Sequence, residues 1–509
     1  MERLRPDVII GIDLGTTNSC GAVVLPNGQV KIIPQRNGEA IVPSIFAIDD
    51  KGNELVGHEA KRQWQLNPRN TLYATKRLIG RSPHDVVVDN VQRSVAFEVE
   101  AGGAGEVAVA CQGRQFQVHE VSARILAKIR DVASDFMGFR AGRAVVTVPA
   151  YFSDRQRQAV KAAGRLIGLE VVRIINEPTA AALAYGIGKK LRERVLVFDL
   201  GGGTFDVSII EIRDRVFEVK ATGGDIFLGG LDFDDAIVRR VIGSFREQHQ
   251  IDLSQDPVAM QRIRDLAERT KIDLSSRTEV PFSIPFITMT DDGRPLNLDL
   301  RLARRDLEQL TFPLVERSLR MVERVMRDAG LAPRDIDEVM LVGGQTRMPI
   351  IQRMLGDWFG KPPSKGVHPD EAVAVGAALY GWSLQENSDL KLQLLDVIPM
   401  AIGLEAADGK MRVVLPRNAA IPNAKALPAT NSVDGQRELS VRIFQGDDPV
   451  AERNELLGEF TFDGVRPCPA GQVRLEILFE VSVEGILTVS ASDRDTGKRM
   501  RTTVRVTES

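Results

Sequence analysis

Asp13-Leu14-Gly15-Thr16-Thr17-Asn18-Ser19, near the start of the chain, decides the fold, because it returns in related form as Asp199-Leu200-Gly201-Gly202-Gly203-Thr204-Phe205-Asp206. Each copy follows an apolar β-type run, residues 8–12 and 195–198. A strand that ends in an acid and then a glycine-rich turn directs backbone N–H groups at a phosphate. The threonine hydroxyls add donors, and the carboxylate can hold a hydrated magnesium ion. Either turn alone could belong to an ordinary hairpin, but the pair predicts two similar halves that close on one nucleotide.

The length and composition indicate a globular protein of several domains. The 509 residues are too many for one hydrophobic core, so about two to four domains are expected. Apolar residues make up 43% and charged residues 27%, which is typical of globular proteins. Because the net charge is −3 and charges of both signs are intermixed, nothing in the composition favours nucleic acid as a partner.

Targeting and metal signals are weak. Residues 1–7 are charged and lack the apolar segment of a signal peptide, and no apolar run approaches the roughly 20 residues that cross a bilayer. Cys20, Cys111 and Cys468 are far apart and odd in number, which favours reduced thiols. We therefore expect a cytoplasmic protein without a membrane partner. The five scattered histidines argue against zinc, and the P-loop and dinucleotide motifs are absent.

Up to about residue 385, short β-branched runs alternate with amphipathic helices, as in α/β proteins. Residues 145–148 predict a strand that stops at Pro149. The run from Ser153 to Gln156 then predicts a capping box at the start of a helix that ends near Gly168. Residues 177–186 predict another helix, with a proline in its first turn.

The pattern changes near residue 387. Leucine alternates with polar residues over 390–396, which suits an extended segment that adds to a sheet edge, or alternatively the first strand of the next domain. Later residues predict a compact antiparallel β-sandwich, with strands at 411–415, 439–444, 473–479, 486–490 and 502–506. The expected domains are therefore an ATPase domain over 1–386, a linker over 387–395 and the sandwich over 396–509.

The residue types alone suggest parts of a nucleotide hydrolase, which needs a metal shell, phosphate donors and a group that places water. Asp13 and Asp199 could hold the metal through water. Lys76 could stabilise phosphoryl charge, although a lone lysine is usually a surface residue, and Glu177 could merely complement a helix dipole. A base and ribose could be enclosed by one helix face, which carries Glu268, Lys271 and Ser275, together with the distant Arg347. Alternatively, this helix face is simply exposed to solvent.

Five longer phrases carry a family resemblance: residues 10–19, 148–152, 175–182, 198–206 and 341–347. They resemble the DnaK, or seventy-kilodalton heat-shock protein, family, in order from about residue 7 to the end. The resemblance implies a duplicated actin-like (ribonuclease H-like) ATPase domain followed by an antiparallel β-sandwich that binds unfolded polypeptide. The implied cofactors are ATP or ADP and Mg²⁺, with K⁺ as a further candidate ion.

The resemblance also assigns roles by position. It implies Lys76, Glu177, Asp199, Thr204 and Asp206 as catalytic residues. It implies that Asp13 and Asp199 serve the metal through water. The implied nucleotide-binding positions are Asp13, Gly15, Thr16, Thr17, Gly201, Gly202, Gly203, Gly229, Gly230, Glu268, Lys271, Ser275, Gly343, Gly344, Arg347 and Asp370.

Coupling positions and partners follow from the same resemblance. The implied coupling set is Pro149, Arg157, Arg173, Asn176, Leu390, Leu392, Leu394 and Asp396, some of which would meet J-domain partners. ATP would dock the leucine segment on the ATPase domain, and hydrolysis would release it. A nucleotide exchange factor would bind near residues 37–38 and 291–293. Unfolded polypeptides would be the clients.

Three departures from the family limit these expectations. The sequence ends just after the last expected strand, so we expect no helical lid and faster peptide release. In the expected peptide groove, Leu404 and Leu439 keep the apolar character of the family, whereas Ala407, Ala429 and Ser432 are smaller or changed. Phe227 and Leu231 replace residues that are commonly polar in the family.

These observations favour an ATP-driven peptide-binding chaperone. A regulatory or scaffold protein that senses nucleotide and barely uses the groove is the main alternative, supported by the small groove residues. A sugar kinase or filament former would share the duplicated motif but not the appended sandwich and leucine segment. Intact Lys76, Glu177 and leucine residues favour the chaperone.

Overall fold

The computed structural model describes residues 7–187, 192–290, 292–364, 368–386, 388–499 and 501–505. Some positions of the sequence analysis lie outside these ranges: most of the charged N-terminal segment, Asp291 of the expected exchange-factor loop, Asn387 of the expected linker and the last residues of the sandwich. In the part of the chain that is described, no helix is both long and apolar enough to cross a membrane.

The two phosphate motifs lie in two sheets that repeat one connection pattern. In the first sheet β1 runs parallel to β11 and antiparallel to β2. In the second, β13 runs parallel to β18 and antiparallel to β14. Each motif therefore turns from a strand flanked by a parallel neighbour into an antiparallel hairpin. The strands of the two sheets in the first and second halves are β1 (Ile9–Asp13), β2 (Asn18–Val24), β3 (Val30–Ile32), β4 (Ile41–Pro43), β11 (Arg143–Val148), β12 (Glu170–Asn176), β13 (Arg192–Leu200), β14 (Phe205–Arg213), β15 (Val216–Asp225) and β18 (Glu338–Val342).

Helices and small sheets complete the body that these two sheets form, which we call the ATPase body after the activity expected from the sequence. Its helices are α1 (His58–Gln63), α2 (Val86–Ser94), α3 (Val118–Met137), α4 (Asp154–Leu166), α5 (Glu177–Gly186), α6 (Gly230–His249), α7 (Pro257–Leu274), α8 (Arg304–Asp328), α9 (Pro349–Phe359) and α10 (Ala372–Ser383). Its small sheets contain β5 (Phe46–Ile48), β6 (Glu54–Val56), β7 (Thr71–Leu72), β8 (Val99–Ala101), β9 (Val107–Cys111), β10 (Arg114–Gln117), β16 (Glu279–Met289) and β17 (Pro295–Ala303). The expected capping box at Ser153 is confirmed, because its side chain accepts from Gln156 N.

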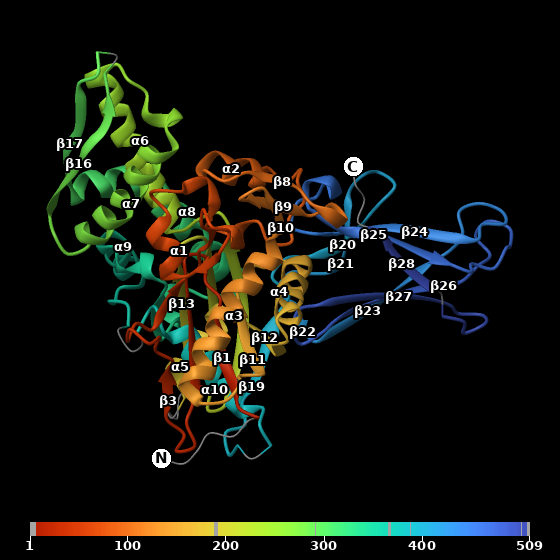
Figure 1. Cartoon of the computed structure of the whole chain (residues 1–509). Coiled ribbons are helices and arrows are strands. Elements are labelled where there is room, and N and C mark those ends of the chain that lie inside the picture. The colour runs from red at the N-terminus through yellow and green to blue at the C-terminus, as the bar shows by residue number, and fades with distance from the viewer. Residues whose placement is uncertain are drawn as a thin grey trace.

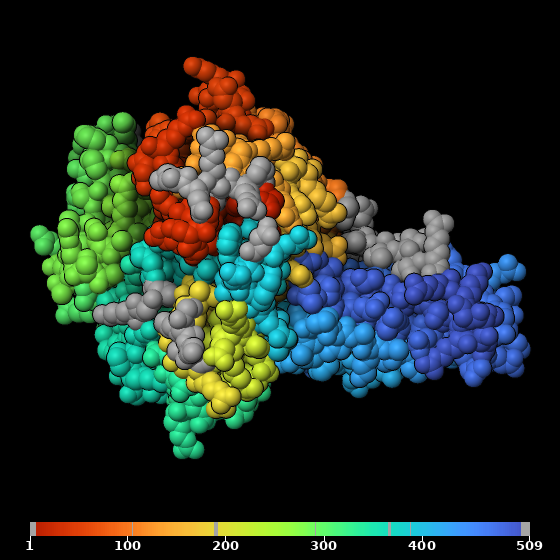
Figure 2. Space-filling view, turned by 90° about the horizontal axis from the view of Figure 1, so that it is seen from below, coloured from red at the N-terminus to blue at the C-terminus, as the bar shows by residue number. Residues whose placement is uncertain are grey.

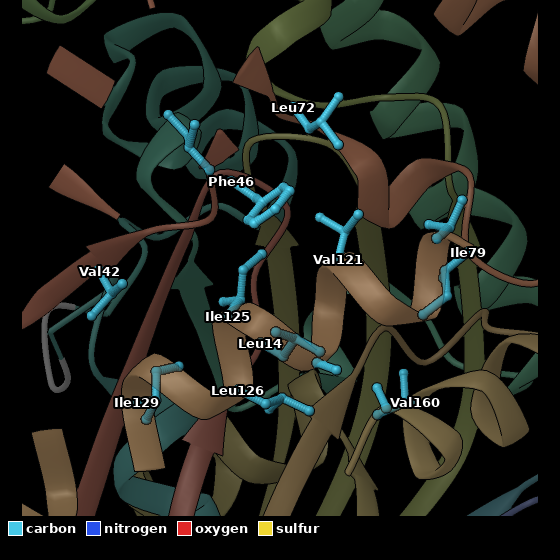
Figure 3. Packing of buried hydrophobic residues seen from close by; sticks show 14 of the residues in the cluster. Leu14, Val42, Phe46, Leu72, Ile79, Val121, Ile125, Leu126, Ile129 and Val160 are labelled. Carbon is cyan, nitrogen blue, oxygen red and sulfur yellow. The ribbon is translucent and has the colours of Figure 1, made fainter. Parts of the chain in front are cut away.

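The core of the first half forms around α3. This helix is amphipathic and buries Val121, Ile125 and Ile129 on the face that Figure 3 shows. Phe46 and Leu14 pack in the same cluster, from β5 and from the first phosphate motif. The phosphate turn is therefore held by the hydrophobic core directly beneath it.

Helices α5 and α10 cross so closely that only glycine fits at the crossing. A Cβ atom built on Gly376 of α10 would lie 1.7 Å from the backbone oxygen of Ala180 in α5. This close approach lets α10 also pack against β1, where Gly11 meets the backbone of Ala378. The crossing thus joins the two halves at the base of the cleft.

Gly376→Ala is expected to destabilise the protein by about 3 kcal/mol, because the backbone of Ala180 cannot yield as a flexible side chain would. Urea unfolding would measure this. Gly243→Ala is the matched control, since Gly243 lies in α6 with no atom within 4 Å of a built Cβ. That change should stabilise by about 0.5 to 1 kcal/mol. Equal effects of the two substitutions would contradict the close crossing.

The C-terminal strands form two facing antiparallel sheets, which we call the sandwich. It extends away from the ATPase body in Figure 1, and Figure 2 shows it seated against one side of that body. Its sheets have the orders β21-β20-β24-β25-β28 and β23-β26-β27. The strands of these two sheets are β20 (Ile402–Glu405), β21 (Met411–Leu415), β23 (Asn423–Ala429), β24 (Glu438–Gln445), β25 (Glu455–Asp463), β26 (Leu475–Val481), β27 (Leu487–Asp493) and β28 (Arg501–Arg505). The short strand β22 (Ala420–Ile421), between β21 and β23 in the chain, pairs with neither sheet.

The sequence analysis missed β22 and three strands of these two sheets, β20, β23 and β25. In β20, Gly403 interrupts the alternation, and β23 is largely exposed and contains Pro428. Such strands have little hydrophobic periodicity. We have no comparable reason for β25, whose pattern includes several apolar residues.

The leucine segment does add to a sheet edge. Strand β19 (Gln393–Val397) runs parallel to β15, with Gln393 opposite Val216 and Leu395 opposite Glu218. Its last residues also pair with β22, antiparallel. The two possibilities left open by the sequence therefore both hold, because one strand extends the ATPase sheet and begins the next unit.

Candidate functional site

A deep cleft lies between the two halves of the ATPase body, and both phosphate motifs line it. The sequence-predicted residues that line this cleft are Asp13, Gly15, Thr16, Thr17, Lys76, Glu177, Asp199, Gly201, Gly202, Thr204, Gly230, Glu268, Lys271, Gly343, Gly344, Arg347 and Asp370. Asp13 and Asp199, which are 186 positions apart in the chain, thus meet at one site because each lies at the carboxyl end of a central strand.

The two phosphate turns touch each other. A Cβ atom on Gly202 would lie 1.9 Å from Thr17 Oγ1, and one on Gly203 would lie 2.3 Å from Thr16 Cγ2. Glycine is therefore required in the second turn for the turns to meet. The resulting arrangement brings the hydroxyls of the first turn against the backbone of the second, as a phosphate cradle requires.

Lys76 is a buried residue of the cleft. It lies in the short helix η2 (Thr75–Arg77), and its Nζ lies 2.7 Å from Oε1 of Glu177, the first residue of α5. Both side chains are about nine-tenths or more buried. The possibility that Lys76 is an ordinary surface lysine is therefore wrong. Because Glu177 pairs with this cation, complementing the helix dipole is not its only contact.

Three buried aspartates surround this pair. Burial, followed by repulsion from Glu177, raises the pKa of Asp13 to about 7 and that of Asp206 to about 8. The same causes raise the pKa of Asp199 well above its usual range. Asp13 accepts from Thr147 Oγ1 at 3.1 Å, and Asp206 accepts from the Tyr151 N–H at 3.1 Å.

This excess of buried negative charge fits a cation between the two halves. Within the described ranges, no three acidic, histidine or cysteine side chains are arranged to ligate one ion directly. The donor set therefore fits an ion held through water, with Asp13 and Asp199 as the nearest pair of candidates. Mg²⁺ commonly keeps several waters in nucleotide sites.

At the far end of the cleft, basic side chains lie beside the acidic ones. Lys271 Nζ donates to Gly230 O at 2.9 Å and lies 3.0 Å from Asp234 Oδ1. Arg347 Nη2 lies 2.6 Å from Asp370 Oδ2. Glu268 and Lys271 face the cleft from α7, and the exposed guanidinium of Arg347 lies at its rim. A planar base and its ribose would find stacking and hydrogen-bonding groups here.

The cleft lining does not include four predicted positions, Gly203 and Asp206, whose contacts are given above, and Ser275 and Gly229. Ser275 caps the end of α7, and its hydroxyl donates to Lys271 O. Gly229 packs against the backbone of Gly203, and its N–H donates to Asp232. Both therefore support residues that face the cleft.

Three of the predicted coupling residues, Arg157, Asn176 and Asp396, are joined by hydrogen bonds. Arg157 Nη2 donates to Asn176 Oδ1 at 2.8 Å, and Asn176 Nδ2 donates to Asp396 Oδ2 at 2.9 Å. Thr179 Oγ1 donates to the same Asp396 oxygen at 3.2 Å. Pro149 is buried where β11 ends, near Ala150, whose carbonyl accepts from Arg157.

The remaining coupling positions surround this chain. Leu392 and Leu394 pack against the buried cluster that contains α5, while Leu390 packs against a second cluster beside α10. Arg173 lines a small cavity with Asp396, and its Nε is buried without a hydrogen-bond partner. All the predicted coupling residues therefore lie around the base of the linker.

A family model described as Hsp70 protein matches residues 9–509. The chain belongs to the Hsp70 family. It is 46% identical over 498 residues to the chaperone protein dnaK of Cyanidioschyzon merolae (strain NIES-3377 / 10D), covering 97% of this chain and 81% of that protein. The family consists of ATP-binding chaperones that act in protein folding, and its members are ATPases. The resemblance recognised in the sequence is thereby confirmed.

The expected groove residues of this Hsp70 chain lie in the sandwich, in two environments. Leu404, Ala429 and Leu439 are half-buried and pack against the sandwich core. Ala407 is exposed in the turn after β20, and Ser432 is exposed beyond β23, with its N–H bonded to Gln436 Oε1. The half-buried residues thus form an apolar base, and the exposed residues beside it are small or polar. The role of these five residues in peptide binding stays a prediction.

The expected exchange-factor loops are exposed turns. Asn37 and Gly38 lie in the turn before β4, and Asn37 donates to Glu39. Asp292 pairs with Arg294 at the tip of the hairpin formed by β16 and β17. The structure leaves the role of both loops as a prediction.

The sequence analysis missed the residues that join the ATPase body to the sandwich. Glu484 pairs with Lys161, and its Oε1 accepts from the Ile174 N–H at 3.0 Å. Asp154 Oδ1 accepts from the Leu487 N–H at 2.8 Å. Because these partners lie more than 300 residues apart in the chain, no local pattern could have revealed them.

Further contacts extend this interface on both sides. Glu455 accepts from Ser153 Oγ at 2.7 Å and from Arg81 at 3.1 Å. Asp447 lies 2.5 Å from Arg324, a residue of α8. The only feature of the sequence that could have indicated these contacts is the acidic character of this part of the sandwich, which is also typical of solvated loops.

Proposed function

We propose that this Hsp70 chain is an ATP-dependent chaperone that binds unfolded or extended polypeptide segments, and that ATP hydrolysis controls its peptide affinity through the leucine linker. One observation carries the proposal. Strand β19 pairs at once with β15 of the ATPase body and with β22, whose Ile421 packs in the core of the sandwich. A change in the cleft that moves β15 or Asp396 would therefore reach the sandwich through the backbone.

Hydrolysis in this proposal rests on the cleft residues. Mg²⁺, when bound, would neutralise part of the phosphate charge. The buried Lys76 would stabilise charge that develops on the transferred phosphoryl group, and Thr204 would add a hydroxyl donor. Glu177 and Asp206 would place the attacking water. Lys76 pairs with Glu177, and Asp206 accepts from the Tyr151 N–H, so these groups are held in place and the reaction requires less reorganisation.

The coupling in this proposal rests on differential binding. A nucleotide that favours one arrangement of the two units must, by linkage, change the affinity for peptide. The proposal includes a J-domain co-chaperone near Arg173 and Asn176, a nucleotide exchange factor and a cytoplasmic location. It also places the domain boundaries near residues 386 and 395.

The decisive experiment measures the dissociation rate of a fluorescent unfolded peptide in ATP and in ADP. Release many-fold faster in ATP would support a working chaperone. Equal rates, or no peptide binding, would favour the alternative of a nucleotide-sensing regulatory or scaffold protein. The small side chains at Ala407 and Ser432 are the observation that keeps this alternative in view.

Docking of the sandwich on the ATPase body should strengthen as the pH falls toward 6. Burial, only partly offset by the Leu487 N–H and Gln158, raises the pKa of Asp154 from 3.8 to about 6. The docked state therefore binds more protons than the undocked state. The free energy that this protonation contributes to docking is lost as the pH rises through 6. Between pH 7.5 and 5.5 this amounts to roughly a fourfold change in the docking equilibrium.

Small-angle scattering in ATP would measure the docked fraction at the two pH values. Asp154→Asn is the control, because an amide can still accept from Leu487 N–H but does not titrate. The pH dependence should become smaller in this variant, with Glu455 supplying what remains because burial also raises its pKa. An unchanged pH profile would rule out Asp154 as the titrating group.

A further inference from the structure

A cavity of about 530 Å³ lies where the sandwich meets the ATPase body, on the side where Figure 1 shows α4 beside the sandwich strands. One wall is α4, with Arg155, Gln158 and Ala162. The opposite wall consists of residues of β25 and β27. Because neither unit alone supplies both walls, the cavity exists only while the two units are docked. Its volume is within the range of about 300 to 1,000 Å³ that is usual for small-molecule sites.

The wall that the sandwich supplies is apolar. Leu457 and Phe460 come from β25 of the five-stranded sheet, and Leu487 and Val489 come from β27 of the three-stranded sheet. All four belong to the hydrophobic core of the sandwich or pack against it. The cavity thus reaches the edge of that core. An apolar chain that enters it would remove both itself and these side chains from water, which is favourable.

The wall that α4 supplies carries positive charge without a bonded partner. Arg155 lines the cavity, and its Nη2 is buried without a hydrogen-bond partner. Arg165 also lines the cavity, and its side chain makes no hydrogen bond or ion pair with the residues that the structure describes. A guanidinium that is partly withdrawn from water and has no acceptor would gain a charge-assisted, forked pair from a carboxylate.

An acid of the sandwich, Glu455, interacts with Arg155 electrostatically but does not bond to it. One carboxylate oxygen of Glu455 accepts from Ser153 Oγ at 2.7 Å, and the other accepts from Arg81 at 3.1 Å. Both oxygens are therefore already engaged, and the Arg155 guanidinium is left for another acceptor.

The acids of the cavity lining are Asp154 and Glu106. Asp154 accepts from the Leu487 N–H with Oδ1 and from Gln158 with Oδ2, so its two oxygens are held by the walls. Glu106 is thus the one acid of the lining whose side chain bonds to none of the described residues, against two such arginines. The lining therefore combines an apolar wall with cationic groups that lack acceptors.

We propose that this cavity binds a single-chain amphipathic anion, a carboxylate on an unbranched apolar tail, and that the bound ligand holds the sandwich docked on the ATPase body. The guanidinium of Arg155 binds the carboxylate, and the tail lies along the wall formed by β25 and β27. A ligand that binds only the docked state must stabilise that state, by linkage. The consequence for peptide release rests on the proposed function, whereas ligand binding and its effect on docking do not.

The test uses the whole chain and decanoate as the probe, at concentrations too low for micelles. Calorimetry should detect binding, with octanoate about fifteenfold weaker, because each buried methylene contributes roughly fourfold to affinity. Small-angle scattering, in ADP or in ATP according to which leaves the units partly undocked, should show that decanoate raises the docked fraction. Absence of decanoate binding, or binding without a rise in the docked fraction, would overturn the inference.

A variant and a neutral probe locate the site. Arg155→Gln should weaken decanoate binding about tenfold, because it removes a charge-assisted pair. It should leave the affinity for decanol unchanged, because decanol has the same tail without the charge. Arg62→Gln is the matched control, since Arg62 is exposed in α1 and does not line the cavity, and it should leave both affinities unchanged. Equal decanoate affinity in Arg155→Gln and the unaltered protein would overturn the inference, because the ligand would then bind elsewhere, such as in the peptide groove.

Peptide release separates this inference from the proposed function. If both hold, saturating decanoate should speed the release of a fluorescent peptide in ADP, since it favours the same docked arrangement as ATP. If decanoate binds through Arg155 and raises the docked fraction but leaves the release rate unchanged, the proposed coupling is wrong and the ligand site stands.

Discussion

Lys76→Ala should leave ATP binding intact and reduce hydrolysis by about 10² to 10³-fold. The nearly buried ammonium lies 2.7 Å from Glu177 and is held among three aspartates. The two phosphate turns, which supply most of the binding groups, do not depend on it. Removing Lys76 therefore removes charge stabilisation in the transition state and leaves the phosphate cradle in place.

The loss of this cation has a second consequence. Burial is the main cause that raises the pKa of Asp13 and Asp206, and Lys76 is among the groups that oppose it. Without Lys76 both carboxyls will be protonated up to a higher pH. The pH profile of the residual hydrolysis rate should therefore move to higher pH. A defect in folding alone would not produce this change.

Single-turnover hydrolysis of labelled ATP, with affinity measured separately by calorimetry, distinguishes binding from chemistry. Lys51→Ala is a suitable control, because Lys51 lies in an exposed loop remote from the cleft residues. Undiminished hydrolysis in Lys76→Ala would show that the catalytic assignment is wrong. Loss of ATP binding would show that Lys76 acts in the ground state as well.

The phosphate turns could be predicted from sequence because their chemistry is local. Strand, acid and glycine follow one another in the chain, and the structure places Asp13 and Asp199 at corresponding ends of β1 and β13. The helix that begins at Glu177 and the capping box at Ser153 were predictable for the same reason. Each depends on contacts within a few residues.

The burial of Lys76 and the domain interface could not be derived in this way. A lysine side chain is buried only when a distant partner such as Glu177 compensates it, and nothing beside Lys76 in the chain reveals that partner. Glu484 lies in a short turn between β26 and β27, where an acid is ordinarily solvated. Strand β23 was missed because it is mostly exposed and its periodicity is weak.

Glu484→Ala should uncouple the two units while leaving ATP binding and basal hydrolysis in place. Glu484 joins the sandwich to α4 through Lys161 and to β12 through the Ile174 N–H. Removing a partly buried charge that makes both contacts costs about 3 kcal/mol, or roughly a 100-fold change in the docking equilibrium. ATP should then no longer accelerate peptide release, because its binding is no longer linked to the position of the sandwich.

The peptide dissociation rate in ATP and in ADP measures this loss. Glu476→Ala is the matched control, since Glu476 pairs with Arg494 within the sandwich and does not contact the ATPase body. Lys161→Ala should reproduce part of the effect, and the double variant should lose less than the sum of the single losses. Retention of full ATP-accelerated release in Glu484→Ala would mean that coupling passes through β19 and the other contacts between the units, such as those of Asp154 and Glu455. Glu484→Ala removes the Glu484 contacts and leaves the linker strand β19 unchanged. The experiment therefore distinguishes these two routes of coupling between the units.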